Sequence, residues 1–298
     1  MNRWMRCGRW VLGLALSLGA IAGAERVEAQ VLMRPSVPDA EVLQTQSFQL
    51  AGDAIRLAQF GQIEEAFRRI ELAAQLSPNS TEVLVVLGTL YLQEEQYAKA
   101  INTLNRARVQ APDDPDILMA LGSAHVRQGS YFAALDALKR GLEQQPDNLQ
   151  ALFDLGNAYL LLEDYDEARQ AYERALEVEA EFWPAINNIG LLDYQIGRID
   201  DAIARWQRSI ELDEQAAEPK LALATALFVR GETEKALRLG ASAMQIDATY
   251  GSVDTLRDNL WGERLITDVQ VLLQTDEVSN ALNQARAESA STDLDASF

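Results

Sequence analysis

The chain has 298 residues, 48% of them hydrophobic, and its 45 acidic side chains outnumber its 26 basic ones to give a formal net charge of −19. This acidity excludes the basic footprint that nucleic acids and anionic lipid surfaces require. With one histidine, one cysteine and no glycine-rich phosphate loop, the chain offers neither a metal–histidine site nor a Cys–His nucleophile, so the sequence predicts no enzyme.

The N-terminus has the pattern of an export signal. Three arginines lie within residues 1–9, an apolar run follows at 10–24, and the first acid is Glu25. This order predicts a signal peptide over residues 1–24, with cleavage after Ala24 or, alternatively, after Ala29. An uncleaved membrane anchor is the rival interpretation, but the run is shorter than the roughly 20 apolar residues that span a bilayer as a helix.

Export sets further expectations. The protein is predicted to act outside the cytoplasm, in a periplasm or another extracytoplasmic lumen, without stable membrane insertion after cleavage. The only cysteine, Cys7, lies in the signal, so the mature chain has no thiol. Removing three arginines changes the mature charge to 23 − 45 = −22. Residues 25–46 carry Pro35 and Pro38 and read as a linker that leads into a first helix.

An alanine returns every 34 residues after this linker. A fixed period of this length indicates a repeat architecture. Small residues also recur twelve positions before and seven positions after each alanine, where two helices of a hairpin would cross closely. The period is marked by Ala66, Ala100, Ala134, Ala168, Ala202 and Ala236, and the earlier small positions are Ala54, Gly88, Gly122, Gly156, Gly190 and Ala224.

Apolar spacings of three and four predict two helices within each repeat. Glycines such as Gly129 and Gly197 mark the turn between the two helices. Pro78, Pro112 and Pro146 are expected to end second helices, because proline cannot continue a helix interior.

Residues 149–182, with Leu-Gly, Tyr, Ala and an aromatic at fixed offsets, closely resemble the tetratricopeptide repeat. Six 34-residue repeats over 47–250 show this pattern, and the chain as a whole resembles secreted bacterial members of the family. It implies an all-α fold, a right-handed superhelical solenoid of antiparallel helix pairs. The first and last repeats depart from the pattern, for example at Asp53 and Gly240, as terminal repeats commonly do.

The C-terminal part leaves the 34-residue period. Residues 251–285 keep helical periodicity through Leu256, Leu260 and Leu265, and are expected to form capping helices, with a further short helix opening near Thr275. Residues 286–298 are small and polar and are expected to be disordered.

In this family the concave face, lined by the first helix of each repeat, binds partners. The matching positions here are mostly apolar with a few amides, and Arg127 is their only basic residue, so the clamp that some members use for a C-terminal carboxylate is missing. The predicted partner-binding residues are Val85, Met119, Phe153, Asn157, Asn187, Asn188, Leu191 and Tyr194. Two alternatives stay open: several of these residues pack between repeats, or the protein's own C-terminal segment fills the groove.

The sequence therefore predicts a non-catalytic scaffold that binds an apolar peptide or helix of a client protein, in the assembly of an envelope or membrane complex. The alternative is an acidic factor for cation handling or solubility in the same compartment. No cofactor or metal is expected, since Asp113, Asp114 and Asp116 lack the spacing of a calcium loop. His125 replaces a tyrosine of neighbouring repeats and is read as a packing residue.

Overall fold

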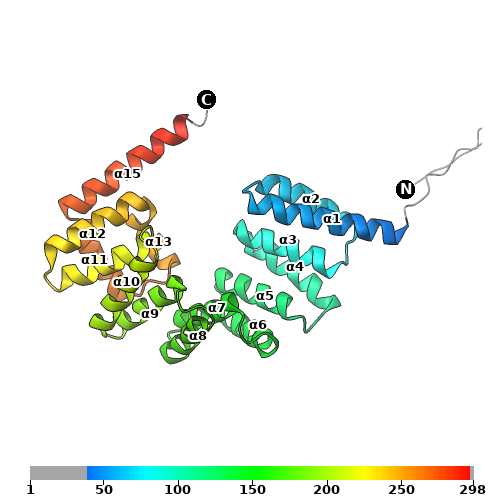
Figure 1. Ribbon diagram of the computed structural model, residues 1–298, viewed down its shortest axis with the longest axis horizontal. Helices are drawn as coiled ribbons and strands as arrows, with labels where there is room; N and C mark the ends of the chain where they lie inside the picture. The colour runs from blue at the N-terminus through cyan, green and yellow to red at the C-terminus, as the bar shows by residue number, and fades with distance from the viewer. Residues whose placement is uncertain (1–38, 296–298) are drawn as a thin grey trace, which may run out of the picture. The chain divides into compact units, whose positions relative to one another are not determined.

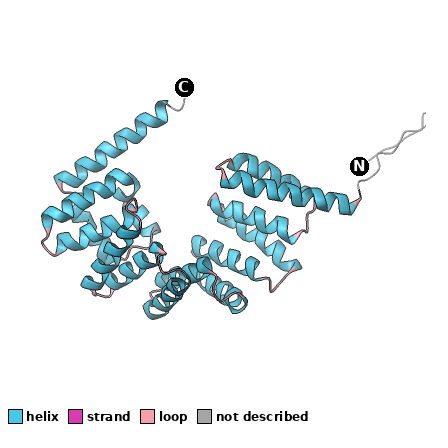
Figure 2. Ribbon diagram, in the orientation of Figure 1, coloured by secondary structure: helices cyan, strands magenta, loops and turns pink. Residues whose placement is uncertain are grey.

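The computed structural model describes residues 39–295, with side-chain surroundings through residue 289. The expected signal peptide lies outside the described residues, as does most of the linker. The described part consists of helices and loops without a strand (Figure 2). It confirms the expected all-α solenoid of helix pairs.

Twelve helices form six antiparallel pairs that follow one another in chain order (Figure 1). The pairs are α1 (Ala40–Gln59) with α2 (Ile63–Leu76), α3 (Thr81–Gln93) with α4 (Tyr97–Gln110), α5 (Pro115–Gln128) with α6 (Tyr131–Gln144), α7 (Leu149–Leu161) with α8 (Tyr165–Val178), α9 (Trp183–Gln195) with α10 (Ile199–Leu212), and α11 (Ala217–Val229) with α12 (Thr233–Ile246). Each second helix also packs against the first helix of the next pair, and the first helices contact one another from α1 to α7. The first helices therefore form a common inner layer.

The periodic small residues lie where the two helices of a pair cross. A Cβ atom added to Gly156 would lie 2.5 Å from Cδ1 of Tyr172, and one added to Gly190 would lie 2.6 Å from Nε1 of Trp206. Both aromatic side chains are fully buried. The steric reason predicted for the small positions is thus confirmed.

The turns also follow the sequence. Gly129 and Gly197 have φ values of +83° and +87°, the left-handed conformation that glycine adopts without strain, between the helices of their pairs. Helices α2, α4 and α6 each end two residues before Pro78, Pro112 or Pro146, as expected.

Two polar features share the 34-residue period. The side chains of Ser80, Asp114 and Asn148 accept hydrogen bonds from backbone N–H groups at the starts of α3, α5 and α7, which satisfies donors that a helix N-terminus leaves free. On the second helices, Arg106, Arg140 and Arg174 donate to the carbonyl oxygens of Pro78, Pro112 and Pro146. These bonds join consecutive repeats.

The segment after the sixth pair forms η1 (Ala248–Gly251), α13 (Val253–Asp258), α14 (Glu263–Leu273) and α15 (Asp276–Asp295). Helix α15 continues the stack on α12, whereas α14 turns back onto α9 and α11. The structure differs from two expectations here. The helix that opens near Thr275 is 20 residues long rather than short, and it continues through residues 286–295, where disorder was expected.

Candidate functional site

A cavity of about 670 Å³ opens on the inner layer of the stack. Its walls come from the first helices α5, α7, α9 and α11, from the starts of α4 and α6, and from the end of α13 with the turn after it. The lining residues are Glu95, Tyr97, Val126, Arg127, Tyr131, Phe153, Asn157, Leu161, Trp183, Pro184, Asn187, Asn188, Glu218, Thr255, Arg257, Asp258, Asn259 and Leu260. Segments far apart in the sequence thus meet at one site.

Three asparagines and a tyrosine form a buried network at this cavity. The hydroxyl of Tyr172 donates to Oδ1 of Asn157 at 2.7 Å, and Nδ2 of Asn188 donates to the same oxygen at 2.9 Å. Nδ2 of Asn187 donates to Oδ1 of Asn188 at 3.1 Å. Oδ1 of Asn187, whose residue is only 1% exposed, has no hydrogen-bond partner in the described part of the chain.

Glu218 adds a carboxyl group beside this network. Nε1 of Trp261, in the turn that follows α13, donates to its Oε1 at 3.1 Å. Burial raises the pKa of Glu218 to about 7, against the lowering effect of hydrogen bonds from Asn187 and Trp261. Among the described residues, no lysine or arginine contributes to this shift or forms an ion pair with the carboxyl group.

Aromatic rings form another part of the wall. Phe153 is half-buried and meets Phe182 edge to face, with ring centroids 5.3 Å apart, and lies 5.8 Å from the ring of Tyr172. Trp183 is half-buried at the start of α9. These rings offer apolar faces to whatever enters the cavity.

The charges around the cavity do not balance. Its acids are Glu95, Glu218 and Asp258, and its bases are Arg127 and Arg257. Nε of Arg257 is 3.1 Å from Oε1 of Glu263, outside the cavity lining, so that cation already has a partner. The cavity is therefore acidic in net terms.

The structure brings together half of the sequence-predicted residues. Phe153, Asn157, Asn187 and Asn188 line the cavity, but the three asparagines bond mainly to one another and to Tyr172 rather than standing free for a peptide backbone. Met119 is buried against Gly141 of α6, consistent with the core alternative.

Val85 is half-buried beside the core cluster of α3 to α6 and does not line this cavity. Its role in binding stays a prediction, as do the roles of the other seven residues.

The remaining two predicted residues are covered by the chain itself. Leu191 and Tyr194 are buried in one cluster with Leu265, Ile266 and Val269 of α14. The hydroxyl of Tyr194 donates to Oδ2 of Asp268 at 2.6 Å. The C-terminal segment thus occupies the inner face of α9 and α11 and borders the open cavity with Thr255–Leu260.

Sequence reasoning did not find Glu218 or Trp261. Glu218 occupies the second position of its repeat's first helix, the position that Pro184 holds one repeat earlier, and both line the cavity. The same position holds Glu82, Asp116 and Gln150 in earlier repeats, and none of these lines the cavity, so the repeat position alone does not indicate Glu218. The partnership with Trp261 has no signal in the repeat pattern either, because Trp261 lies outside the repeats.

The structure also describes the aspartates considered as cation ligands, the single histidine, and the helices that could be considered for a membrane span. Asp114 caps α5 and Asp113 accepts a hydrogen bond from Arg140, and within residues 39–295 no group of three or more ligand-type side chains is arranged to hold a metal ion. His125 is half-buried, and burial lowers its pKa. None of the described helices combines the length and apolarity that crossing a bilayer demands.

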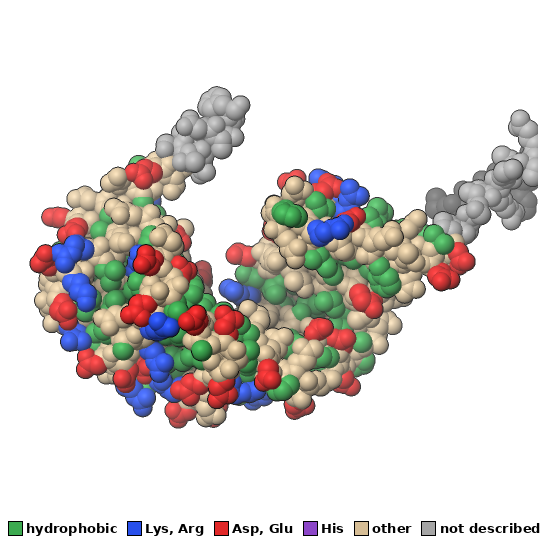
Figure 3. Space-filling model, in the orientation of Figure 1, with side chains coloured by type: hydrophobic (Ala, Val, Ile, Leu, Met, Phe, Trp, Pro, Cys, Tyr) green, Lys and Arg blue, Asp and Glu red, His purple; other side chains and the backbone are tan. Residues whose placement is uncertain are grey.

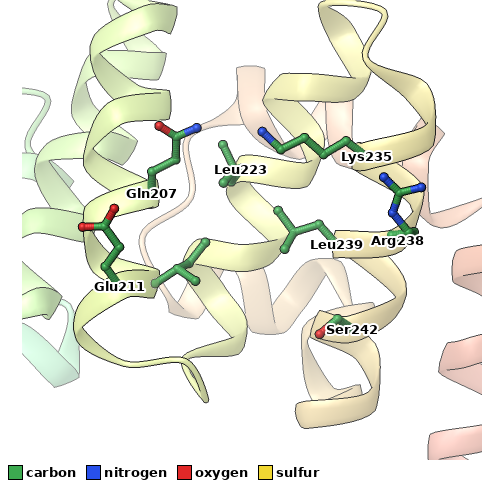
Figure 4. Close-up of a pocket in the computed structure, with 8 residues that line it drawn as sticks. Gln207, Glu211, Leu223, Lys235, Arg238, Leu239 and Ser242 are labelled. Carbon is green, nitrogen blue, oxygen red and sulfur yellow. The ribbon is translucent and has the colours of Figure 1, made fainter.

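A second hollow of about 430 Å³ lies on the outer side, between α10 and α12 (Figure 4). Ile210, Leu223 and Leu239 form its apolar floor. Gln207 and Glu211 stand on one side, and Lys235 and Arg238 on the other (Figure 4). Acidic and basic side chains are likewise interspersed over the visible face of the molecule, as Figure 3 shows. With one acid and two bases in its lining, the outer hollow is basic in net terms, unlike the acidic inner cavity.

Comparison with protein families finds the repeats. One model described as tetratricopeptide repeat matches residues 57–124, and a second with the same description matches residues 119–185 and 187–250. Together they cover nearly all of the predicted repeat region. No curated protein gives a significant match.

Solved structures are similar over much of the chain. PilF of Pseudomonas aeruginosa shares 16% identity with a TM-score of 0.60, over 72% of this chain and 97% of that one. TTC0263 of Thermus thermophilus, a thermophilic TPR protein, shares 21% identity with a TM-score of 0.52, over 61% and 99%. MamA shares 27% identity with a TM-score of 0.48, over 55% and 96%. The first two likenesses show the fold.

Proposed function

This chain belongs to the tetratricopeptide repeat family, and from its inner surface we propose that it is a non-catalytic scaffold that holds a segment of a client protein in the cavity between α5, α7, α9 and α11. The observation that carries the proposal is the cavity of about 670 Å³ on the inner layer, open beside the part that α14 occupies. Concave inner surfaces are the usual binding faces of such solenoids.

The chemistry of the cavity favours an extended segment. Half-buried Phe153, Leu161 and Trp183 supply apolar contacts, while the asparagine network supplies fixed polar groups. Ten of the eighteen lining side chains are polar or charged, so the cavity offers positioned polar groups beside a smaller apolar surface, the two components from which ligand sites are built. A helix would need a longer apolar groove, and α14 already covers the inner positions of α9 and α11.

The compartment of the proposed function rests on the sequence of residues 1–24. Their basic start, short apolar core and small residues favour export, and so a client outside the cytoplasm, in the assembly of an envelope or membrane complex. Fractionation of the source cell tests this part: we expect mature protein that begins after Ala24 or Ala29 in an extracytoplasmic fraction. Full-length protein in the cytoplasm would contradict it.

Photo-crosslinking tests the binding surface. A photoreactive phenylalanine analogue is placed at Phe153 in the living source cell, and crosslinked products are identified by mass spectrometry. The control is the same analogue at Phe132, which is 78% exposed on α6. We expect a client that crosslinks from position 153 and not from 132. Products confined to residues 255–273 of the same chain, or identical from both positions, would overturn the proposal.

A further inference from the structure

The inner cavity holds one hydrogen-bond acceptor without a donor among the described residues and one carboxyl group without a cation. Oδ1 of Asn187 has no hydrogen-bond partner within residues 39–295, although its residue is 1% exposed. Glu218 lines the same cavity, and its carboxyl group has no cation within the described residues. A buried acceptor without a donor is uncommon in proteins and calls for an explanation, such as an ion or another donor that binds there.

The walls suit a side chain with an apolar stem and a cationic end. Trp183, Phe153 and Leu161 provide aromatic and apolar surface, and aromatic faces attract cations. The lining acids Glu95, Glu218 and Asp258 outnumber the two lining bases. Of these bases, Arg257 is paired with Glu263, and Arg127 interacts electrostatically with Asp154. Burial raises the pKa of Glu218 to about 7, as expected for a carboxyl group whose charge is left uncompensated.

We propose that this cavity takes a basic side chain, arginine in preference to lysine, from the client segment, with the guanidinium group donating to Glu218 and to Oδ1 of Asn187. Arginine is preferred because its planar fork can donate to two acceptors at once. The inference rests on the proposed function, since it assumes that a client segment enters the cavity, and it adds what the cavity selects in that segment.

Peptide selection on the full chain provides the probe. Random peptides displayed on phage are selected against the immobilised wild-type protein, and the affinity of the enriched peptides is measured in solution. Each basic residue is then replaced in turn, with citrulline for arginine, because citrulline keeps the shape of the guanidinium group without its charge. We expect one position at which this replacement weakens binding about tenfold or more, as for loss of a charge-assisted hydrogen-bonded pair.

Two variants that each remove one negative charge distinguish binding in the cavity from general attraction of a basic peptide to an acidic protein. Glu218→Gln keeps an acceptor for Trp261, and Glu173→Gln changes an exposed acid on the outer helix α8. The Glu218→Gln variant should bind the arginine peptide and its citrulline form with similar affinity. The Glu173→Gln variant should still bind the arginine peptide more tightly. Equal binding of the two peptide forms by wild type overturns the inference without depending on any variant.

A third variant distinguishes this failure from failure of the proposed function. If Phe153→Glu weakens peptide binding but replacing the peptide's arginine with citrulline does not, the segment enters the cavity and only the proposed selection of a basic side chain is wrong. If Phe153→Glu leaves peptide binding unchanged, the cavity is not the binding site and both proposals fail.

Discussion

At the scale of single residues, Glu218 both holds two parts of the fold together and lines the proposed binding site. Its carboxyl group accepts from Trp261, which lies 43 positions further along the chain, and so connects α11 to the turn between α13 and α14. Burial disfavours the ionised form, and the folded-state pKa is therefore near 7 rather than the ordinary 4.5. The titratable neighbours Tyr172 and Tyr250 have pKa values that are raised further above neutrality, so they stay uncharged over this range.

This shift predicts a pH-dependent effect of Glu218→Gln. Between pH 4.5 and about 7 the folded state holds a proton that the unfolded state has released, so the unfolding free energy contributed by Glu218 falls as the pH rises. Glutamine has no such dependence. Relative to wild type, the variant should gain stability from pH 5 to pH 8, by up to about 3 kcal/mol. Urea unfolding of both proteins across this range measures it, and a constant difference would contradict the raised pKa.

The helix crossings give a second prediction. In Gly156→Ala the new methyl group would collide with the fully buried ring of Tyr172, and overpacking of this kind destabilises by about 1–3 kcal/mol. Gly52→Ala is the control, because no atom lies within 4 Å of its added Cβ in α1, and alanine should there stabilise by about 0.5–1 kcal/mol. Thermal unfolding compares them. A stabilised Gly156→Ala protein would contradict the steric role of the small positions.

At the scale of elements, the helix pairs could be predicted because small and apolar residues recur at the same positions in successive repeats. The departure at Gly240 also has a reason, since its added Cβ would lie 3.1 Å from Cγ2 of Val278, where α15 packs. The position of α14 could not be predicted. Its apolar spacing shows that it must bury a face, but only packing selects the inner side of α9 and α11, because α14 lies outside the period that fixes the other contacts.

The same limit applies to the site. Phe153 and Asn157 occupy inner positions of a regular repeat, where the sequence predicted them, and both line the cavity. Leu191 occupies the position equivalent to Asn157 one repeat later, and Tyr194 the position equivalent to Leu160, yet α14 covers both. The repeat pattern identifies which side chains face inward, and the non-repeating segment decides which of them stay accessible.

Two substitutions on α14 test this docking. Ile266 is 2% exposed in the cluster with Leu191 and Tyr194, and Ile266→Ala should cost about 2–5 kcal/mol. Val271 on the same helix is 57% exposed, so Val271→Ala should change stability by about 0.5 kcal/mol or less. Hydrogen exchange should accelerate in α9 and α11 for Ile266→Ala only. Equal effects of both substitutions would show that α14 does not pack by this face.

At the scale of the described stack, stability is distributed along the chain. Buried apolar residues form separate clusters, from Ala51–Leu90 at one end to Leu191–Leu282 at the other, instead of one central core. Contacts run between neighbouring pairs, with α14 as the element that reaches back across a pair to α9. In such a solenoid each repeat is stabilised mainly by its neighbours.

This organisation predicts that a destabilising substitution loosens only the neighbouring repeats. Leu104→Ala removes a fully buried side chain that packs on Gly88, and Met244→Ala does the same within the cluster of the last pairs. Each should cost about 2–5 kcal/mol. Hydrogen exchange should accelerate in α3 to α5 for Leu104→Ala and in α11, α12 and α15 for Met244→Ala, while the opposite end keeps its protection, because local opening needs only the nearest interfaces to break. If either substitution accelerated exchange equally along the whole stack, the repeats would form one cooperative unit, and a client bound between α5 and α11 would then stabilise both ends alike.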